Sequence, residues 1–495
     1  MKRYVPILGF VLSTAASLVM LQSLSACSDK PISIDQVVHV LTMDNGAMRE
    51  LKRFNKAYDK YSNDLHNERQ RSHFRDAYRL VRANYIVKVD DAKLIDAALK
   101  GIEKMHPKPG AVKPVVLVEA ALDSMLQSLD PHSSYLNPDE YKDMKMTNKG
   151  EFGGLGIEVR MESGLIKVVS PIEDTPAFRA GIQPGDIITH LDGVPVKGKT
   201  LSAAVKIMRG RPGVDINLTV LRGERAPFVV NIVRAIIQVR SVRWRREGNV
   251  GYVRLSGFTE QVGNKLTSAM SNLFDEAQAA NVPLQGFVLD LRNNPGGLLT
   301  QALFVSDAFL ESGEIVSVRE RDPRKGRIYN AETGDLAHGL PIVVLINEGS
   351  ASASEIVAGA LKDHRRAVIM GRRSFGKGSV QSIHPMPAEG ALRLTIARYY
   401  APSGHTIQAR GVAPNIVLNR PQSKDGEDDI KITKEADLPD ILSGDNYQET
   451  AASVILPMES CPAAGPEGKD VELGCALAYI HAGTAQAFKK VVRLN

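Results

Sequence analysis

A buried strand that runs through a short turn into a helix is the feature that most constrains how this chain folds. Residues 341–347 (PIVVLIN) are apolar and β-branched, residues 348–350 (EGS) form a turn, and a helix is expected from Ala351 to about Leu361. Strand–turn–helix units belong to α/β folds, and they leave the first backbone N–H groups of the helix exposed at a sheet edge. Such groups can stabilise an oxyanion, which suits a nucleophilic serine in the turn.

Ser352 opens the expected helix and allows two interpretations. With Glu355 it fits S-x-x-E, the capping box that pairs the first N–H groups of a helix. It also fits a catalytic nucleophile, which needs a neighbouring base. A histidine base and its orienting carboxylate would come from His364, His384 or His405 and from Asp363 or Asp290. None of these histidines stands in a recognisable motif.

A lysine base is the alternative to a histidine, and Lys377 is the candidate. Residues 371–377 fit G-x-x-x-x-G-K, the first part of a phosphate-binding pattern, but Gly378 stands where that pattern requires the Ser or Thr that binds magnesium. Residues 379–387 (SVQSIHPMP) contain β-branched residues and two prolines, so the helix that a phosphate site needs is not expected. Lys377 could act as a base if its amine were neutral, because burial and nearby cations lower the pKa of a lysine.

A glycine-rich turn at residues 290–297 (DLRNNPGG) joins an expected strand, 287–291, to a helix that begins at Leu298. Such a turn could aim backbone N–H groups at an oxyanion. A tight connection between a strand and a helix would need the same glycines.

Residues 150–236 consist of short glycine-rich strands with one expected helix, Leu201 to Met208, and they resemble a PDZ domain. The segment 151–157 (EFGGLGI) would point consecutive N–H groups at the carboxylate of a chain terminus, while a strand edge pairs with the peptide. A plain hairpin turn is the alternative for GGLG. The predicted peptide-binding residues are Gly153, Gly154, Leu155, Gly156, Ile157, Leu201, Val205 and Met208.

Several motifs in a fixed order closely resemble those of the C-terminal processing peptidases, the tail-specific proteases of family S41. They are LDPHSSYL, DLRNNPGG, NEGSASASEI, FGKGSVQ and YYAPSGHTIQ, and the resemblance spans roughly residues 74–420. It implies an α/β multidomain protein with a ClpP/crotonase-like catalytic core, an inserted PDZ domain, a helical N-terminal region and a C-terminal extension.

The resemblance also implies roles for individual residues. Ser352 is the expected nucleophile, Lys377 the general base, and Gln381 the residue that orients the lysine. The expected oxyanion hole consists of the N–H groups of Ala353 and of Gly296 or Gly297.

The first 27 residues indicate export. A basic start (MKR) precedes the apolar run 5–24, and LSAC at 24–27 resembles a bacterial lipobox with Cys27 as the lipidated residue. A plain secretory signal or a transmembrane anchor is the alternative. Cys461 and Cys475 are expected to form a disulfide in an oxidising compartment, with two buried thiols as the alternative.

These patterns divide the chain into consecutive parts. The expected parts are a lipoprotein signal peptide (1–26), a tether (27–73), a helical N-terminal region (74–149), a PDZ domain (150–236), a serine peptidase core (237–420) and a C-terminal extension (421–495).

The sequence, with its family resemblance, predicts a serine endopeptidase that is lipid-anchored in the periplasm of a bacterial cell envelope. It would cleave envelope proteins recruited by their C-terminal tails, with a helical-repeat lipoprotein adaptor, a membrane and a second copy of the chain as further partners. No cofactor or metal is expected. The net charge of +6 is spread over interleaved basic and acidic residues, which argues against nucleic-acid binding. A non-catalytic PDZ adaptor and a histidine-triad hydrolase are the alternative functions.

Overall fold

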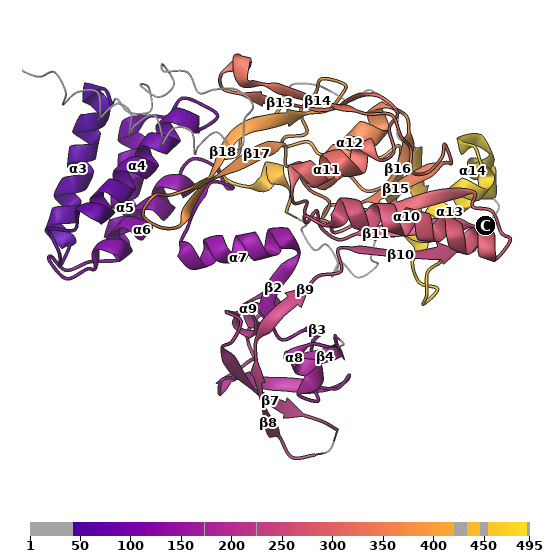
Figure 1. Ribbon diagram of the computed structural model, residues 1–495, viewed down its shortest axis with the longest axis horizontal. Coiled ribbons are helices and arrows are strands. Elements are labelled where there is room, and N and C mark those ends of the chain that lie inside the picture. The colour runs from indigo at the N-terminus through magenta and orange to yellow at the C-terminus, as the bar shows by residue number, and fades with distance from the viewer. Residues whose placement is uncertain (1–42, 173, 224, 420–432, 446–453, 493–495) are drawn as a thin grey trace, which may run out of the picture. The chain divides into compact units, whose positions relative to one another are not determined.

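The computed structural model describes residues 43–172, 174–223, 225–419, 433–445 and 454–492 (Figure 1). It divides into two compact units, residues 43–129 with 384–388, and the other described residues. Cys27 and the expected signal peptide lie outside the described residues. Within those residues, no helix combines the length and the apolar character needed to cross a bilayer.

Helices with buried apolar faces form the first unit. Their bounds are α3 (Asn45–Tyr61), α4 (Glu68–Asn84), α5 (Asp91–Glu103) and α6 (Pro114–Gln127). Phe54 of α3 stacks on Phe74 of α4 with ring centroids 3.5 Å apart, and both side chains are fully buried.

The prediction of a tether over residues 27–73 is therefore wrong for α3 and for the start of α4. The many charged residues of α3 give the segment a polar composition, but its apolar residues recur at helical spacing. Ala47, Leu51, Phe54 and Tyr58 lie on one face of α3, and all are buried. Periodicity, rather than average polarity, determines whether such a segment folds.

A β-rich module follows α7 (Pro138–Lys149). Its strands are β2 (Glu151–Gly154), β3 (Ile157–Glu162), β4 (Leu165–Pro171), β5 (Ile187–Leu191), β6 (Val194–Pro195), β7 (Asp215–Leu221), β8 (Phe228–Val233) and β9 (Ala235–Gln238), and its helices are α8 (Pro176–Arg179) and α9 (Leu201–Met208). β2 pairs with β9, while β3, β4, β5, β7 and β8 form an antiparallel sheet in that order, with β6 beside β5. β3 is thus an edge strand of this sheet.

A seven-stranded sheet forms the centre of the second unit (Figure 1). Its strands, in spatial order, are β10 (Val242–Glu247), β11 (Val250–Leu255), β12 (Gly286–Asp290), β15 (Ile342–Ile346), β16 (Ala367–Gly371), β19 (Ile416–Asn419) and β20 (Val454–Pro457). All neighbours pair in parallel except β10 with β11. The central strands read as continuous apolar runs because both of their faces are buried.

Helices cover both faces of this sheet. α10 (Val262–Ala279), α11 (Leu299–Asp307) and α12 (Ala353–Asp363) share one hydrophobic core with Leu289 and Val344. α13 (Val471–Ala482) and α14 (Ala485–Val491), yellow in Figure 1, share the opposite core with Val288 and Val343. Alternate residues of β12 and β15 therefore pack into different cores.

The expected C-terminal extension is not a separate region in the structure. β20 continues the central sheet by pairing with β19, and α13 and α14 bury its second face. Cys461 and Cys475 are joined in a disulfide that ties the start of α13 to the chain after β20. A mixed polar and charged stretch at 421–429 suggested a boundary, but the strand and helices beyond it complete the same core.

A second, smaller sheet lies in the same unit. It consists of β1 (Ser134–Leu136), β13 (Gly313–Glu320), β14 (Arg327–Ala331), β17 (Ser379–Pro385) and β18 (Ala391–Tyr400). Short 3₁₀ turns complete the described elements: η1 (Pro323–Lys325), η2 (Glu435–Asp437) and η3 (Met458–Ser460). β1, from the LDPHSSYL motif, pairs with β18, which brings this motif beside strands far along the chain.

We expect Phe54→Ala to loosen the helical unit, because deleting a buried aromatic ring typically costs about 3–5 kcal/mol. Hydrogen exchange of peptides from α3 and α4 should accelerate. Met48→Ala is the control, since Met48 is 43% exposed on the same helix. Equal exchange rates in the two variants would contradict the packing of α3 on α4.

Candidate active site

Ser352 lies in the turn between β15 and α12, as the N-terminal cap of the helix. Its backbone adopts φ 55° and ψ −112°, a region that residues with a side chain rarely occupy. Holding a residue there costs about 1–3 kcal/mol, so neighbouring contacts must enforce the conformation. The half-buried serine thus stands at a sharp, held turn at the start of a helix.

Glu355 supplies those contacts. Its fully buried carboxylate accepts hydrogen bonds from the N–H of Ser352 (2.7 Å), the hydroxyl of Ser374 (2.6 Å), and the N–H groups of Gly376 (2.7 Å) and Lys377 (2.9 Å). Burial raises the pKa of Glu355 to about 7. The hydrogen bonds act in the opposite direction, because they favour the charged form of the carboxylate. One carboxylate therefore joins the turn of Ser352 to the loop of Lys377.

This contact also explains the near-match to a phosphate-binding loop. The N–H groups of Gly376 and Lys377 surround an anion, but that anion is the carboxylate of Glu355. The chain then enters β17, a strand, rather than the helix that a phosphate site requires. The sequence-based rejection of a nucleotide site agrees with this geometry.

Lys377 is half-buried in the loop between β16 and β17. Burial is the main cause that lowers its pKa, and the Arg393 guanidinium lowers it further. The carboxylates of Glu435, Asp130 and Glu355 act in the opposite direction. The balance favours the neutral amine more than in water, as a lysine base requires.

Glycines bring the 290–297 turn against Ser352. Gly296 has φ 101°, and a Cβ added there would lie 2.9 Å from the Ser352 Cβ and 3.0 Å from the Ala353 nitrogen. The Gly296 N–H donates to the Asn294 side chain at 3.0 Å. Among the described residues, no hydrogen bond engages the N–H of Gly297 or of Ala353. Of the two predicted glycines, Gly297 is thus the one whose N–H could donate to an oxyanion, because the Gly296 N–H already donates to Asn294.

Gln381 lies on β17 and donates from Nε2 to the Ser379 hydroxyl (2.9 Å) and the Thr395 hydroxyl (3.2 Å). Thr395 in turn donates to the buried Asp130 carboxylate at 3.0 Å. The structure gives Gln381 these partners, so its orientation of Lys377 stays a prediction. The contact between Thr395 and Gln381 was not predicted, because the two residues meet only through the pairing of β17 with β18.

Two of the three histidine candidates, His364 and His405, contact other groups. His364 Nε2 contacts the Glu314 carbonyl oxygen at 2.7 Å, and His405 lies 3.5 Å from Asp445. Burial lowers the pKa of His384. Within the part of the chain that the structure describes, no hydrogen bond links a histidine to Ser352.

The predicted orienting carboxylates are also occupied. Asp290 binds Arg292, Tyr252 and Arg254, and Asp363 accepts from the Ser403 N–H. A histidine triad therefore has no support in the geometry.

The β-rich module holds the predicted peptide-binding residues in different settings. Gly156 has φ 79°, and a Cβ there would lie 2.2 Å from the Thr175 Cβ, so glycine is required. Ile157 begins the edge strand β3, and Leu201 and Val205 are half-buried on α9.

Three of the predicted groove residues contribute to packing within the module. Gly153 leaves no room for a Cβ, which would lie 2.1 Å from the Gly210 carbonyl oxygen. Leu155 and Met208 belong to the hydrophobic core, with exposed fractions of 3% and 7%. The side chains of Leu155, between β2 and β3, and of Met208, at the end of α9, therefore pack inside the module rather than form an open groove wall.

Comparisons with known proteins agree on both regions. Residues 249–418 match the model of peptidase family S41, and residues 153–227 match that of the PDZ domain. A carboxy-terminal-processing protease of Bartonella bacilliformis is 50% identical over 361 residues, which cover 73% of this chain and 77% of that protein. A probable CtpA-like serine protease of Staphylococcus haemolyticus is 35% identical over 67% of this chain and 66% of that protein. The solved photosystem II D1 C-terminal processing protease is 27% identical, with a TM-score of 0.45, and the match covers 71% of this chain and 93% of that chain.

Glu355→Gln should impair catalysis, because an amide cannot accept all the hydrogen bonds that the carboxylate receives. Each hydrogen bond to a charged group is worth about 1.5–3 kcal/mol, so kcat should fall by about tenfold or more. Hydrogen exchange in residues 350–355 and 374–378 should also accelerate. Glu332→Gln on the surface is the control, and unchanged exchange and kcat in Glu355→Gln would refute the role of this carboxylate.

Proposed function

The chain belongs to the carboxy-terminal-processing proteases of peptidase family S41, and we propose that Ser352 and Lys377 form its catalytic dyad. The hydrogen bonds of Glu355 carry this proposal, since a single buried carboxylate holds the backbone of both residues. The lowered pKa of Lys377, caused mainly by burial, supports its role as base. The central sheet with helices on both faces supports a ClpP/crotonase-like core.

The first half of the reaction forms an acyl-enzyme. Neutral Lys377 Nζ accepts the proton of the Ser352 hydroxyl while Oγ attacks the carbonyl carbon of the scissile peptide bond. The oxygen of the tetrahedral intermediate receives hydrogen bonds from the N–H groups of Ala353 and Gly297. The C–N bond then breaks, and the Lys377 ammonium gives its proton to the departing amine.

The second half releases the acyl group. Lys377, neutral again, takes a proton from a water molecule, whose oxygen attacks the ester carbon. Collapse of the second tetrahedral intermediate returns the proton to Ser352 Oγ and frees the new carboxyl end. In both halves Gln381 would orient the lysine through its amide oxygen, because its Nε2 already donates to Ser379 and Thr395.

The PDZ domain would recruit substrates by their C-terminal segments. The edge of β3 can accept one more strand, and the turn at Leu155–Ile157 can present N–H groups to a terminal carboxylate. A solved PDZ domain of a carboxy-terminal protease from Vibrio cholerae is in complex with peptide; it is 28% identical over 18% of this chain and 99% of that chain, with a TM-score of 0.18. We propose envelope proteins as the substrates, with the enzyme held at a periplasmic membrane surface through Cys27.

The alternative functions fit less well. A pure PDZ adaptor would not need a lysine whose pKa is lowered beside a strained serine turn. A histidine-triad hydrolase would need a histidine near Ser352, and His364 and His405 instead contact Glu314 and Asp445. We also propose association with a helical-repeat lipoprotein and with a second copy of the chain. The dyad itself needs neither partner.

Ser352→Ala and Lys377→Ala should each lower kcat by on the order of 10⁴-fold or more, because dyad members act as a unit. The measurement is the cleavage of a loosely folded protein with an apolar C-terminus. His364→Gln is the control and should retain activity. Loss of activity in His364→Gln but not in Lys377→Ala would support the histidine triad. Cleavage by neither wild type nor variants, even with envelope partners added, would support the adaptor.

The pH profile of kcat should rise as the pH increases through the pKa of Lys377, because only the neutral amine can act as base. Since burial and Arg393 lower that pKa, the midpoint of the rise should lie below the ordinary lysine value of about 10.4. Arg393→Gln removes a cation that disfavours the ammonium, so the rise should move to higher pH. Arg373→Gln, at an exposed position of the loop that carries Lys377, should leave the pH of the rise unchanged. A flat profile in the wild type, measured where chemistry limits the rate, would contradict a lysine base.

A further inference from the structure

We name the described residues after position 432 (433–445 and 454–492) the C-terminal segment. This segment lies outside the region matched to family S41, residues 249–418, and it contacts the loops of the proposed active site at two points. We name residues 290–297 the oxyanion loop and residues 372–378 the lysine loop. One contact comes from the first turn of α13, and the other from η2. Both use a buried glutamate, Glu472 and Glu435 respectively.

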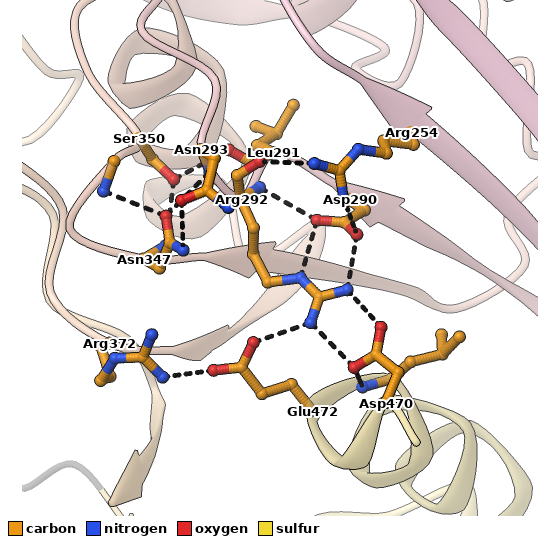
Figure 2. A network of polar contacts seen from close by, with 12 residues as sticks. Arg254, Asp290, Leu291, Arg292, Asn293, Asn347, Ser350, Arg372, Asp470 and Glu472 are labelled. Carbon is orange, nitrogen blue, oxygen red and sulfur yellow. Dashed lines mark hydrogen bonds and ion pairs between the residues drawn. The ribbon is translucent and has the colours of Figure 1, made fainter. Parts of the chain in front are cut away.

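The first contact is a network of charges around the buried Arg292 of the oxyanion loop, in which Asp470 is half-buried (Figure 2). Its guanidinium binds Asp290 at 2.7 Å, Asp470 at 2.7 Å and Glu472 at 2.7 Å. Asp470 caps α13 and also accepts the Leu473 N–H. The oxyanion loop is therefore fixed to the first turn of the C-terminal helix.

Glu472 extends this network to the lysine loop. One carboxylate oxygen binds Arg292, and the other binds Arg372, at the start of the lysine loop (Figure 2). Arg372 also binds Glu348, in the turn that precedes Ser352, at 2.8 Å. Glu472 thus bridges the oxyanion loop and the lysine loop directly.

The second contact holds the middle and the end of the lysine loop. The N–H of Glu435 donates to the Phe375 carbonyl oxygen at 3.2 Å. The Glu435 carboxylate accepts from Gln408 at 2.8 Å, and the Gln408 amide oxygen accepts the Gly378 N–H at 2.9 Å. His132 of the LDPHSSYL motif also contacts this carboxylate at 2.9 Å.

We propose that the C-terminal segment is a positioning element of the active site, in which Glu472 aligns the oxyanion and lysine loops and Glu435 fixes the lysine loop on its other side. This inference rests on the proposed Ser352–Lys377 dyad. Buried, fully paired charges hold such loops in one arrangement, because breaking any one pair leaves a charge without its partner. Catalysis is sensitive to this alignment, since a displacement of about 1 Å can cost on the order of 100-fold in rate.

The disulfide stabilises the first contact. It joins Cys461, before α13, to Cys475, one turn after Glu472, across a sequence separation of 14 residues. The first turn of α13, with Asp470 and Glu472, lies inside the closed loop. Oxidation therefore restricts the movement of the helix end that contacts Arg292 and Arg372.

Glu435 has a second effect, through charge. Four charged groups from different elements act on Lys377: Arg393 of β18, Asp130 before β1, Glu355 of α12 and Glu435 of η2. The carboxylate of Glu435 favours the ammonium, so its neutralisation lowers the pKa of Lys377. The rising limb of the pH profile then moves to lower pH, which a purely structural defect would not cause.

The test uses the mature chain with Glu472→Gln, Glu435→Gln and the control Glu467→Gln. Glu467 belongs to the same segment, but its side chain is 79% exposed. The rate is expressed as kcat per active site, titrated with a serine-acylating reagent, so that unfolded molecules do not count. We expect Glu472→Gln to lower kcat by about tenfold or more with KM changed less than about twofold and the pH limb in place. A Cys461→Ser/Cys475→Ser variant should show a smaller loss in the same direction.

Glu435→Gln should move the rising limb to lower pH, whatever its effect on the rate. A limb that stays in place or moves to higher pH would overturn the role of Glu435. A kcat per site in Glu472→Gln equal to that of Glu467→Gln would overturn the role of Glu472. If Ser352→Ala and Lys377→Ala are inactive, these outcomes refute the positioning role of the C-terminal segment and leave the dyad intact. An active Ser352→Ala would refute the dyad itself.

Discussion

The arrangement of the Ser352 turn and the Lys377 loop depends on one buried carboxylate. Glu355 receives backbone N–H groups from the serine turn and from the lysine loop, and these hydrogen bonds hold Ser352 in a conformation that its side chain disfavours. A buried anion is tolerated only where all of its hydrogen-bonding capacity is used, and this one is fully surrounded by donors. The lysine loop resembles a phosphate-binding loop for the same reason, because its glycines also allow N–H groups to converge on an anion.

One segment of the chain both covers the central sheet and contacts the loops at residues 290–297 and 372–378. The parallel strands are buried on both faces, so the second face needs α13 and α14. Once α13 covers that face, its first turn places Asp470 and Glu472 against Arg292 and Arg372. The segment that completes the hydrophobic core thereby also completes a charged network around the loops at residues 290–297 and 372–378.

Lys377 experiences a balance of opposing influences rather than a single one. Burial and one guanidinium disfavour its ammonium, while three carboxylates favour it. Those carboxylates come from α12, from the LDPHSSYL motif and from η2, which are widely separated in the chain. The basicity of Lys377 therefore depends on the relative placement of all these elements, and small movements of any of them alter it.

The sequence by itself determined the local elements and the family, and it predicted the roles of Ser352 and Lys377. The helix 201–208, the strand before Ser352 and the helix after it follow from apolar periodicity and turn residues, and the family follows from motifs in a fixed order. Local patterns could not decide which donor meets which acceptor. Two contacts join residues that are distant in the chain: Glu355 binds the lysine loop, and Glu472 bridges the oxyanion and lysine loops. Only tertiary packing brings them together, because hydrogen bonds and ion pairs act over a few ångströms and leave no periodic trace in the sequence.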